Sequence, residues 1–154
     1  MNITKINDNY YNINDNLNYT LKDIYIPFKI SKYNNNYYLN IEINIEDTDN
    51  INKKFINEFS NIEKFINNND LDFKNNDFYS NLKIKEFNNK KYYLFRLQLK
   101  KNKNKIITTY QKENEMLNIF KLENKKYYSC NIEISGIWKY KNTYGLQINI
   151  NTIY

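Results

Sequence analysis

Alternating apolar and polar residues near the C-terminus constrain the fold more than any other feature of the chain. Residues 127–138 and 144–150 alternate with a period of two, and the short polar segment 139–143 connects them. This pattern is typical of a β-hairpin. Both glycines lie here: Gly136 is expected to permit a bulge or a close approach within the strand, and Gly145 to ease the exit from the turn.

The same period recurs upstream and predicts several short strands. A turn at residues 88–90 joins two of them into a hairpin, and Pro27 argues that the first strand lies at an edge or contains a bulge. Residues 113–122 fit either a short helix or a strand. Besides the C-terminal hairpin, strands are predicted over residues 24–30, 37–46, 82–85, 92–100 and 106–111.

One segment follows a helical period instead. Apolar residues recur every three or four positions from Ile51 to Ile66, which predicts an amphipathic helix of about four turns with Asp49 or Asn50 as its N-cap. The 154 residues have room for one domain. Short strands with one inserted helix predict a mostly β fold, either a small closed or nearly closed barrel or an open antiparallel sheet with a helix on one face.

Composition excludes several classes of active site. The chain has no histidine, one cysteine and two glycines. It therefore cannot build a histidine-based catalytic dyad, a structural zinc site or a glycine-rich phosphate loop. The densest carboxylate cluster is Glu46, Asp47 and Asp49, for which a metal-dependent nuclease site and a solvated loop are the two hypotheses. We expect a protein without catalytic residues, cofactor or metal.

Charge is segregated along the chain. The net charge is +6; residues 83–105 carry nine cations against Glu86, whereas residues 42–77 carry nine acids against four lysines. AT-rich codons account for the abundance of lysine and asparagine but not for this separation, which favours an anionic partner. No apolar run approaches the roughly 20 residues that span a bilayer. We therefore expect a soluble, intracellular protein without membrane contact.

The C-terminal hairpin also resembles a known family. Gly136-Ile137-Trp138, a polar turn and Gly145-Leu146 resemble the end of single-stranded DNA-binding proteins of large DNA viruses, and also the phage T7-type single-strand binders. The resemblance is strongest over residues 129–150. It implies an OB-like barrel of antiparallel strands over residues 21–154, preceded by a loosely ordered arm over residues 1–20. The phage proteins end in an acidic tail that recruits replication partners; this chain ends without one.

The resemblance implies binding of single-stranded DNA without strong sequence preference during viral replication and recombination. The expected location is the host nucleus or a cytoplasmic viral replication compartment. RNA is an alternative ligand, and self-association and contact with replication proteins are further options. The rival hypothesis is a protein-interaction or assembly module whose exposed strand edges pair with partner chains.

A sequence-tolerant single-strand binder needs a positive groove and aromatic faces for base stacking. Solvated surface lysines are the alternative interpretation of the basic residues. Trp138 shares the core parity of Ile134 unless a bulge at Gly136 turns it outward. Tyr140 and Tyr144 flank the turn, where base contact and turn packing are the alternatives. The predicted nucleic-acid-binding residues are Lys83, Lys85, Lys91, Tyr92, Arg96, Lys100, Lys101, Lys103, Lys105, Trp138, Tyr140 and Tyr144.

Overall fold

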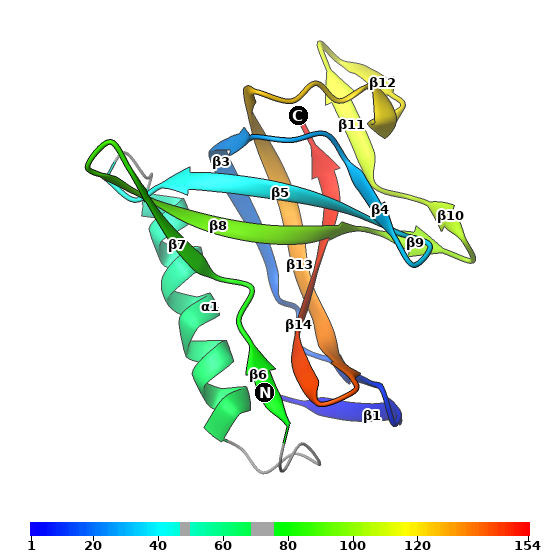
Figure 1. Cartoon of the computed structure of the whole chain (residues 1–154). Coiled ribbons are helices and arrows are strands. Elements are labelled where there is room, and N and C mark those ends of the chain that lie inside the picture. Colours follow the sequence, from blue (N-terminus) through cyan, green and yellow to red (C-terminus); the bar gives the residue numbers. More distant parts are fainter. Residues whose placement is uncertain (47–49, 69–75) are drawn as a thin grey trace.

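A computed structural model describes residues 1–46, 50–68 and 76–154 (Figure 1). One long helix and a 12-stranded sheet make up most of it, with a separate two-stranded hairpin. The elements are β1 (Ile3–Asn7), β2 (Tyr10–Ile13), β3 (Asn18–Ile26), β4 (Ser31–Tyr33), β5 (Asn36–Asn44), α1 (Asn50–Asn68), β6 (Asp77–Tyr79), β7 (Lys83–Phe87), β8 (Lys90–Leu99), β9 (Lys101–Asn102), β10 (Lys105–Ile106), β11 (Thr109–Lys112), β12 (Glu115–Leu117), the 3-10 turn η1 (Ile119–Lys121), β13 (Lys126–Tyr140) and β14 (Thr143–Ile153).

The sheet closes on itself to form a barrel. Its strands follow the order β3-β5-β8-β14-β13, and β13 pairs again with β3. β5 and β8 form the layer at the front of Figure 1, paired from Tyr38↔Gln98 to Asn44↔Tyr92. Among these five barrel strands the pairing is antiparallel except between β8 and β14, which run parallel; outside the barrel, β6 and β11 also pair in parallel with β14. A five-stranded barrel of this kind, with one inserted helix, confirms the predicted mostly β, OB-like class.

Aromatic and branched side chains fill the barrel. Leu39, Ile41 and Ile43 of β5 are buried, as the alternation predicts, together with Phe95, Leu97 and Leu99 of β8. Helix α1 adds Phe55 and Phe59, whose ring centroids lie 5.4 and 5.3 Å from that of Phe95. The predicted N-cap Asp49 lies outside the described residues. No helix in the described part of the chain is both long and apolar enough to cross a membrane.

The first 20 residues differ from the prediction of a loosely ordered arm. β1 and β2 form a hairpin, and β2 pairs with residues 136–138 of β13. Tyr11 and Ile13 are buried there. A Cβ atom at Gly136 would overlap the Tyr10 hydroxyl and lie 2.5 Å from the carbonyl oxygen of Tyr11. Glycine therefore lets β2 dock, and β13 supplies the backbone partners that hold this segment in the sheet.

Two boundaries follow from backbone chemistry. β3 ends at Ile26, directly before Pro27, which has no N–H to donate to a ladder; the strand therefore does not extend to residue 30 as predicted. The ambiguous segment 113–122 divides into β12 and η1. Within η1, the Asn118 side chain accepts a hydrogen bond from Phe120 N–H (2.9 Å) and caps the turn.

Candidate nucleic-acid interface

A groove opens where strands β8 and β14 separate. They pair at Gln98↔Asn149 and Leu99↔Ile150, whereas the beginning of β14 pairs with β6 instead. The two strands therefore diverge, as Figure 1 shows. The resulting space, which we call the β8–β14 groove, has a volume of about 510 Å³. It is lined by Tyr33, Asn34, Asn36, Tyr38, Tyr79, Asn81, Arg96, Gln98, Trp138, Lys139, Tyr140, Leu146, Gln147 and Ile148.

Trp138 reaches this groove because of a β-bulge. The register of β13 against β14 shifts between Ile134 and Gly136, so that Ser135 is an extra residue. After the bulge, Ile137 is the buried residue and Trp138 points away from the barrel core. The bulge that Gly136 is expected to permit is present, and the core position that strand parity predicts for Trp138 is wrong.

The absence of a side chain at Gly145 makes room for the indole ring of Trp138 and is not required by the turn. A Cβ atom there would lie 2.8 Å from Cζ2 of Trp138 and 2.7 Å from the carbonyl oxygen of Tyr79. Its φ is not positive, so the predicted easing of the turn exit does not explain it. Trp138 Nε1 donates a hydrogen bond to the Leu146 carbonyl (3.1 Å), which fixes the ring in place.

Aromatic rings form the walls of the groove. The rings of Tyr79 and Trp138 lie 6.0 Å apart at 51°. Tyr33 and Tyr140 are exposed at the rim, and Tyr38 lies on the outer side of β5. Flat faces that are partly open to solvent are the feature on which unpaired bases stack.

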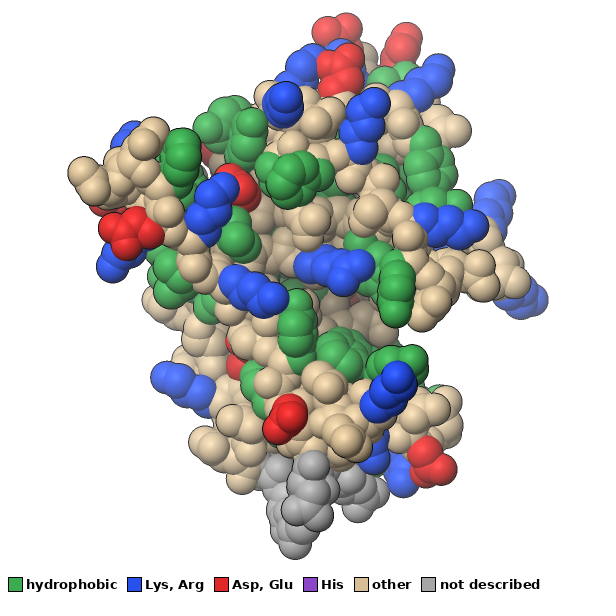
Figure 2. All heavy atoms as spheres, viewed as in Figure 1, with side chains coloured by type: hydrophobic (Ala, Val, Ile, Leu, Met, Phe, Trp, Pro, Cys, Tyr) green, Lys and Arg blue, Asp and Glu red, His purple; other side chains and the backbone are tan. Residues whose placement is uncertain are grey.

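Cations accompany these rings. The Cζ atom of Arg96 lies 4.1 Å from the centroid of the Tyr38 ring, and Lys83 Nζ lies 4.8 Å from that of Tyr79. Lys141 Nζ lies 5.4 Å from the Tyr140 ring. None of the described residues that line the groove is an aspartate or a glutamate. On this face of the molecule, cationic and hydrophobic side chains lie close to one another, with fewer acidic ones among them (Figure 2), which makes it a surface suited to an anionic ligand with flat rings.

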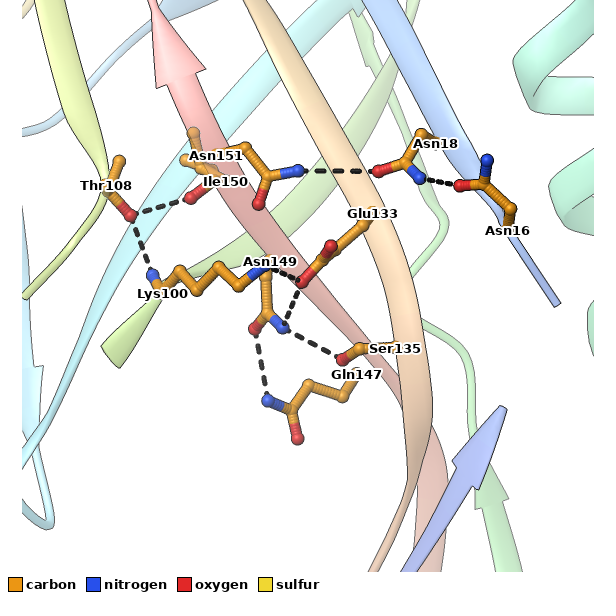
Figure 3. Close-up of polar contacts among 10 residues, drawn as sticks. All are labelled: Asn16, Asn18, Lys100, Thr108, Glu133, Ser135, Gln147, Asn149, Ile150 and Asn151. Atoms are coloured by element: carbon orange, nitrogen blue, oxygen red, sulfur yellow. Dashed lines mark hydrogen bonds and ion pairs between the residues drawn. The ribbon is translucent and has the colours of Figure 1, made fainter. Parts of the chain in front are cut away.

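A polar network along β13 and β14 continues from the groove floor (Figure 3). Gln147 Nε2 donates to Asn149 Oδ1 (3.1 Å), and Asn149 Nδ2 donates to Ser135 Oγ (2.9 Å). Asn149 Nδ2 also approaches Glu133 Oε1 (3.4 Å), which forms an ion pair with Lys100 Nζ at 2.8 Å. The network holds Gln147 at the groove and occupies Lys100, one of the predicted phosphate ligands.

Helix α1 supports one wall of the groove through a buried carboxylate. Glu63 Oε1 accepts a hydrogen bond from Ser80 Oγ (2.7 Å), and Ser80 lies between the lining residues Tyr79 and Asn81. Burial raises the pKa of Glu63 more than the hydrogen bonds from Ser80 and from the Asn81 backbone lower it. Asn81 Nδ2 in turn donates to the Leu146 carbonyl (2.6 Å). The residues that directly follow Tyr79 at the end of β6 are thereby fixed between the helix and β14.

The groove gathers only part of the predicted site. Arg96, Trp138 and Tyr140 line it, and Lys83 lies beside it over Tyr79. Lys85 and Tyr92 lie on the same side of the hairpin but line a different depression. Lys91 is exposed; because it alternates with Tyr92 along β8, it faces the other way.

The remaining predicted residues lie at its margin or inside the protein. Lys101 Nζ donates to the Asn35 carbonyl (2.7 Å), which places the β9–β10 hairpin beside the turn after β4. Lys103 and Lys105 are exposed on that hairpin. Tyr144 is a correction: it is 5% exposed, its hydroxyl lies 3.1 Å from Asn67 Oδ1, and its ring packs against Phe78 at 5.3 Å. It cannot stack with a base in this position.

Sequence reasoning missed four groove residues with ring or charged side chains. Tyr38 carried a signal, because the alternation of 37–46 already puts it on the outer side. Tyr33, Tyr79 and Lys139 lie in segments without a usable period and reach the groove through turns and through the pairing of β6 with β14.

Comparison of this chain with family models, with curated proteins and with solved structures gives no match. Among the described residues, no cluster of three or more cysteine, aspartate or glutamate side chains could hold a metal ion. Of the carboxylates in the nuclease hypothesis, Glu46 is exposed, and Asp47 and Asp49 lie outside the described residues.

Proposed function

We propose that this protein binds single-stranded DNA in the β8–β14 groove without strong sequence preference and without catalysis. The observation that carries the proposal is the juxtaposition of Tyr38, Tyr79 and Trp138 with Arg96 and Lys83 around one groove. Base stacking on aromatic faces and phosphate contacts by cations are the two contributions that sequence-tolerant single-strand binding requires.

The position of the groove on the barrel supports the same function. Its residues come from β5 and β8, which are the second and third barrel strands, and from the β4 hairpin that precedes β5. Lys139 and Tyr140 add the end of β13 beside the turn that leads to β14, between the fourth and fifth barrel strands. In OB-fold barrels this combination of strands and loops binds oligonucleotides.

The chemistry favours an unpaired strand over a duplex. In a duplex the base faces already stack on each other, so the rings of Tyr79 and Trp138 would have nothing to cover. The amide side chains of Asn81, Gln98 and Gln147 offer donors and acceptors. Protection of unpaired DNA during replication and recombination of an AT-rich virus, in the host nucleus or a cytoplasmic replication compartment, is the activity we propose.

Trp138 provides a direct test, because it is the only tryptophan of the chain and lines the groove. Oligo-dT is expected to quench its fluorescence, whereas a duplex of equal length quenches it weakly. With about four phosphate contacts, log affinity should fall against log salt with a slope of about −3. Absence of binding to oligo-dT would refute the proposed function.

A charge-matched pair of variants tests the groove itself. Arg96→Ala is expected to make the salt slope shallower by about 0.7, which is the loss of one phosphate contact. Lys91→Ala removes the same charge from the opposite face of the same strand and should leave the slope unchanged. Equal slopes for both variants would show that the DNA lies elsewhere. RNA of the same length measures the preference between the two nucleic acids.

The strand-edge hypothesis has less support. Among the described strands, the sheet ends in β1 and β12, with five and three residues, and β4, β6 and β7 are no longer than five. Short edges resist pairing with other chains. An interaction module would self-associate without salt-sensitive DNA binding, so the same titration followed by sedimentation separates the two functions.

A further inference from the structure

A second depression lies at the other weak seam of the barrel. β3 and β5 are paired at Tyr25↔Glu42, and the space where these strands separate has a volume of about 480 Å³. We call it the β3–β5 groove. The side chains that matter here are Tyr25, Phe28, Phe87, Tyr92, Tyr127 and Lys85.

Its aromatic side chains are unusually open to solvent. Phe28 is 63% exposed, Phe87 59% and Tyr127 71%. Tyr127 packs on Tyr25 with ring centroids 5.2 Å apart. Soluble proteins seldom leave several large aromatic side chains exposed together unless the surface binds something.

Lysine side chains lie beside these rings, as cationic side chains do in the β8–β14 groove. Lys85 Nζ lies 5.9 Å from the Phe87 ring and 6.0 Å from the Tyr92 ring. Two acidic residues also line this groove: Glu42, whose charge is compensated by an ion pair with Lys85 at 2.9 Å, and the exposed Asp23, whose neighbour Lys22 lines the groove as well. Lys83, two residues earlier on β7, points to the same side of the hairpin.

The two grooves share one face of the β5–β8 layer. Tyr92 lines the β3–β5 groove and Arg96 the β8–β14 groove, with Leu94 as the one outward residue of β8 between them. At a rise of about 3.3 Å per residue, Tyr92 and Arg96 are about 13 Å apart. Lys83 pairs with Leu94 and therefore lies on the path from one groove to the other.

We infer that the β3–β5 groove is a second stacking site for the same single strand, which crosses the β5–β8 face from one groove to the other. The inference rests on the proposed function. Phosphates of the crossing segment would contact Lys83, and bases would stack on Phe87 and Tyr127. β7 lies in the insertion between the second and third barrel strands, so this site is built in part by a segment outside the five barrel strands.

Charge and continuity favour nucleic acid as the occupant over a protein. An apolar protein partner would have to bury the Lys85–Glu42 ion pair and leave Lys83 and Arg96 unused, whereas a polyanion can use both of these cations. The separation of about 13 Å between Tyr92 and Arg96 is also short enough for one bound strand to reach both grooves, since OB folds bind about 4–16 nucleotides. Two grooves on one face therefore describe one extended site.

Oligo-dT of two lengths tests the inference, with about 5 and about 16 nucleotides as the ends of that range. Phe87→Ala and Tyr127→Ala are each expected to weaken binding of the long oligonucleotide about 5- to 150-fold, which corresponds to one lost stack. Binding of the short one, followed by quenching of Trp138, should stay at the wild-type value. That value also shows that each variant is folded.

Ile84→Ala is the matched control. Ile84 is 63% exposed and lies on the opposite face of the hairpin that carries Phe87; its loss should change neither affinity. If Phe87→Ala and Tyr127→Ala leave the long oligonucleotide at wild-type affinity while Arg96→Ala weakens it, the second site is refuted and the proposed function stands. If the two variants alter self-association and not DNA affinity, the groove binds protein and the inference is again refuted. If wild-type protein binds neither length, the proposed function itself fails.

Discussion

Asn52 of α1 forms two hydrogen bonds with the backbone of Lys22 in β3. They replace the bonds that the neighbouring strand, β13, does not form with this residue. Asn52 Oδ1 accepts from Lys22 N–H (2.9 Å), and Asn52 Nδ2 donates to the Lys22 carbonyl (2.6 Å). The β3–β13 register places Lys22 and Asp23 opposite Ser129 alone, and Asp23 has a φ of 52°. This is a β-bulge. The buried amide thus replaces the ladder partner at the bulge and anchors α1 to β3.

Asn52→Ala is expected to destabilise the protein by about 2–6 kcal/mol. Asn52 is 1% exposed, and its removal leaves two backbone groups without partners, each at a cost of about 1–3 kcal/mol. Urea denaturation measures the free energy of unfolding. Asn61→Ala on the exposed side of the same helix is the control and should change stability by no more than about 0.5 kcal/mol. Equal effects of the two variants would contradict the bulge argument.

Asparagine takes the place of glycine in the tight turns. Four two-residue turns have both residues at positive φ, and the second residue is asparagine in each: Asn35, Asn89, Asn104 and Asn114. Asparagine tolerates this left-handed conformation better than most residues. The sequence predicted the turn at residues 88–90 and a loop over residues 101–105, but it did not predict the turn after Lys112, because asparagine is so frequent in this chain that it marks no position by itself.

At the level of elements, the alternation of apolar and polar residues predicted which face of each regular strand is buried. It failed in β13, where a β-bulge inserts one residue. It identified the inward residues of β5 and β8 correctly, since both strands are regular. For β13 it left both orientations of Trp138 open, because only the extra residue Ser135 decides which face the indole takes. Tyr144 was assigned to the site because its burial depends on Phe78 of β6, which pairs with β14 from far away in the sequence.

The contact between α1 and the β6–β7 connection makes stability depend on pH. Burial raises the pKa of Glu63 above its ordinary value of 4.5. A carboxyl group with a raised folded-state pKa stabilises the fold fully below the unfolded-state value, and this contribution is lost as the pH rises through the folded-state pKa. The wild type should therefore lose stability from about pH 4.5 upward through this group.

Glu63→Gln removes this dependence, because the amide does not titrate. The free energy of unfolding of this variant, measured relative to wild type, is expected to rise between pH 4.5 and neutrality. A difference in stability between the two proteins that does not depend on pH leaves this rise unchanged. Urea denaturation at several pH values measures it, with Glu115→Gln as a control in which the carboxyl is exposed. Parallel curves for wild type and Glu63→Gln would contradict the burial argument.

For the whole molecule, two narrow seams in one closed barrel coincide with the two grooves. The β8–β14 seam and the β3–β5 seam are each held by one or two residue pairs, and a groove lies at each. The sequence predicted Arg96 and Trp138 as binding residues but could not bring them together, since they meet through pairings between distant strands. Tyr38 lies near Arg96 because Asn40, two residues later in β5, pairs with Arg96. No local sequence pattern indicates this register.

A single strand that spans this face should stabilise the entire barrel. At a concentration of 100 times the dissociation constant, a ligand that binds only the folded state adds about 2.7 kcal/mol, which for a chain of this length corresponds to a rise in Tm of about 5–11 °C. Oligo-dT of about 16 nucleotides should produce this rise in a calorimetric or fluorescence melt, and a duplex of equal length should not.

With a salt slope of about −3, raising salt from about 50 to about 200 mM weakens binding about 50-fold, so the rise should shrink to a few degrees at the same ligand concentration. A rise that survives the added salt would mean that the strand is held without phosphate contacts, and the cations of the β5–β8 face would then have no part in binding.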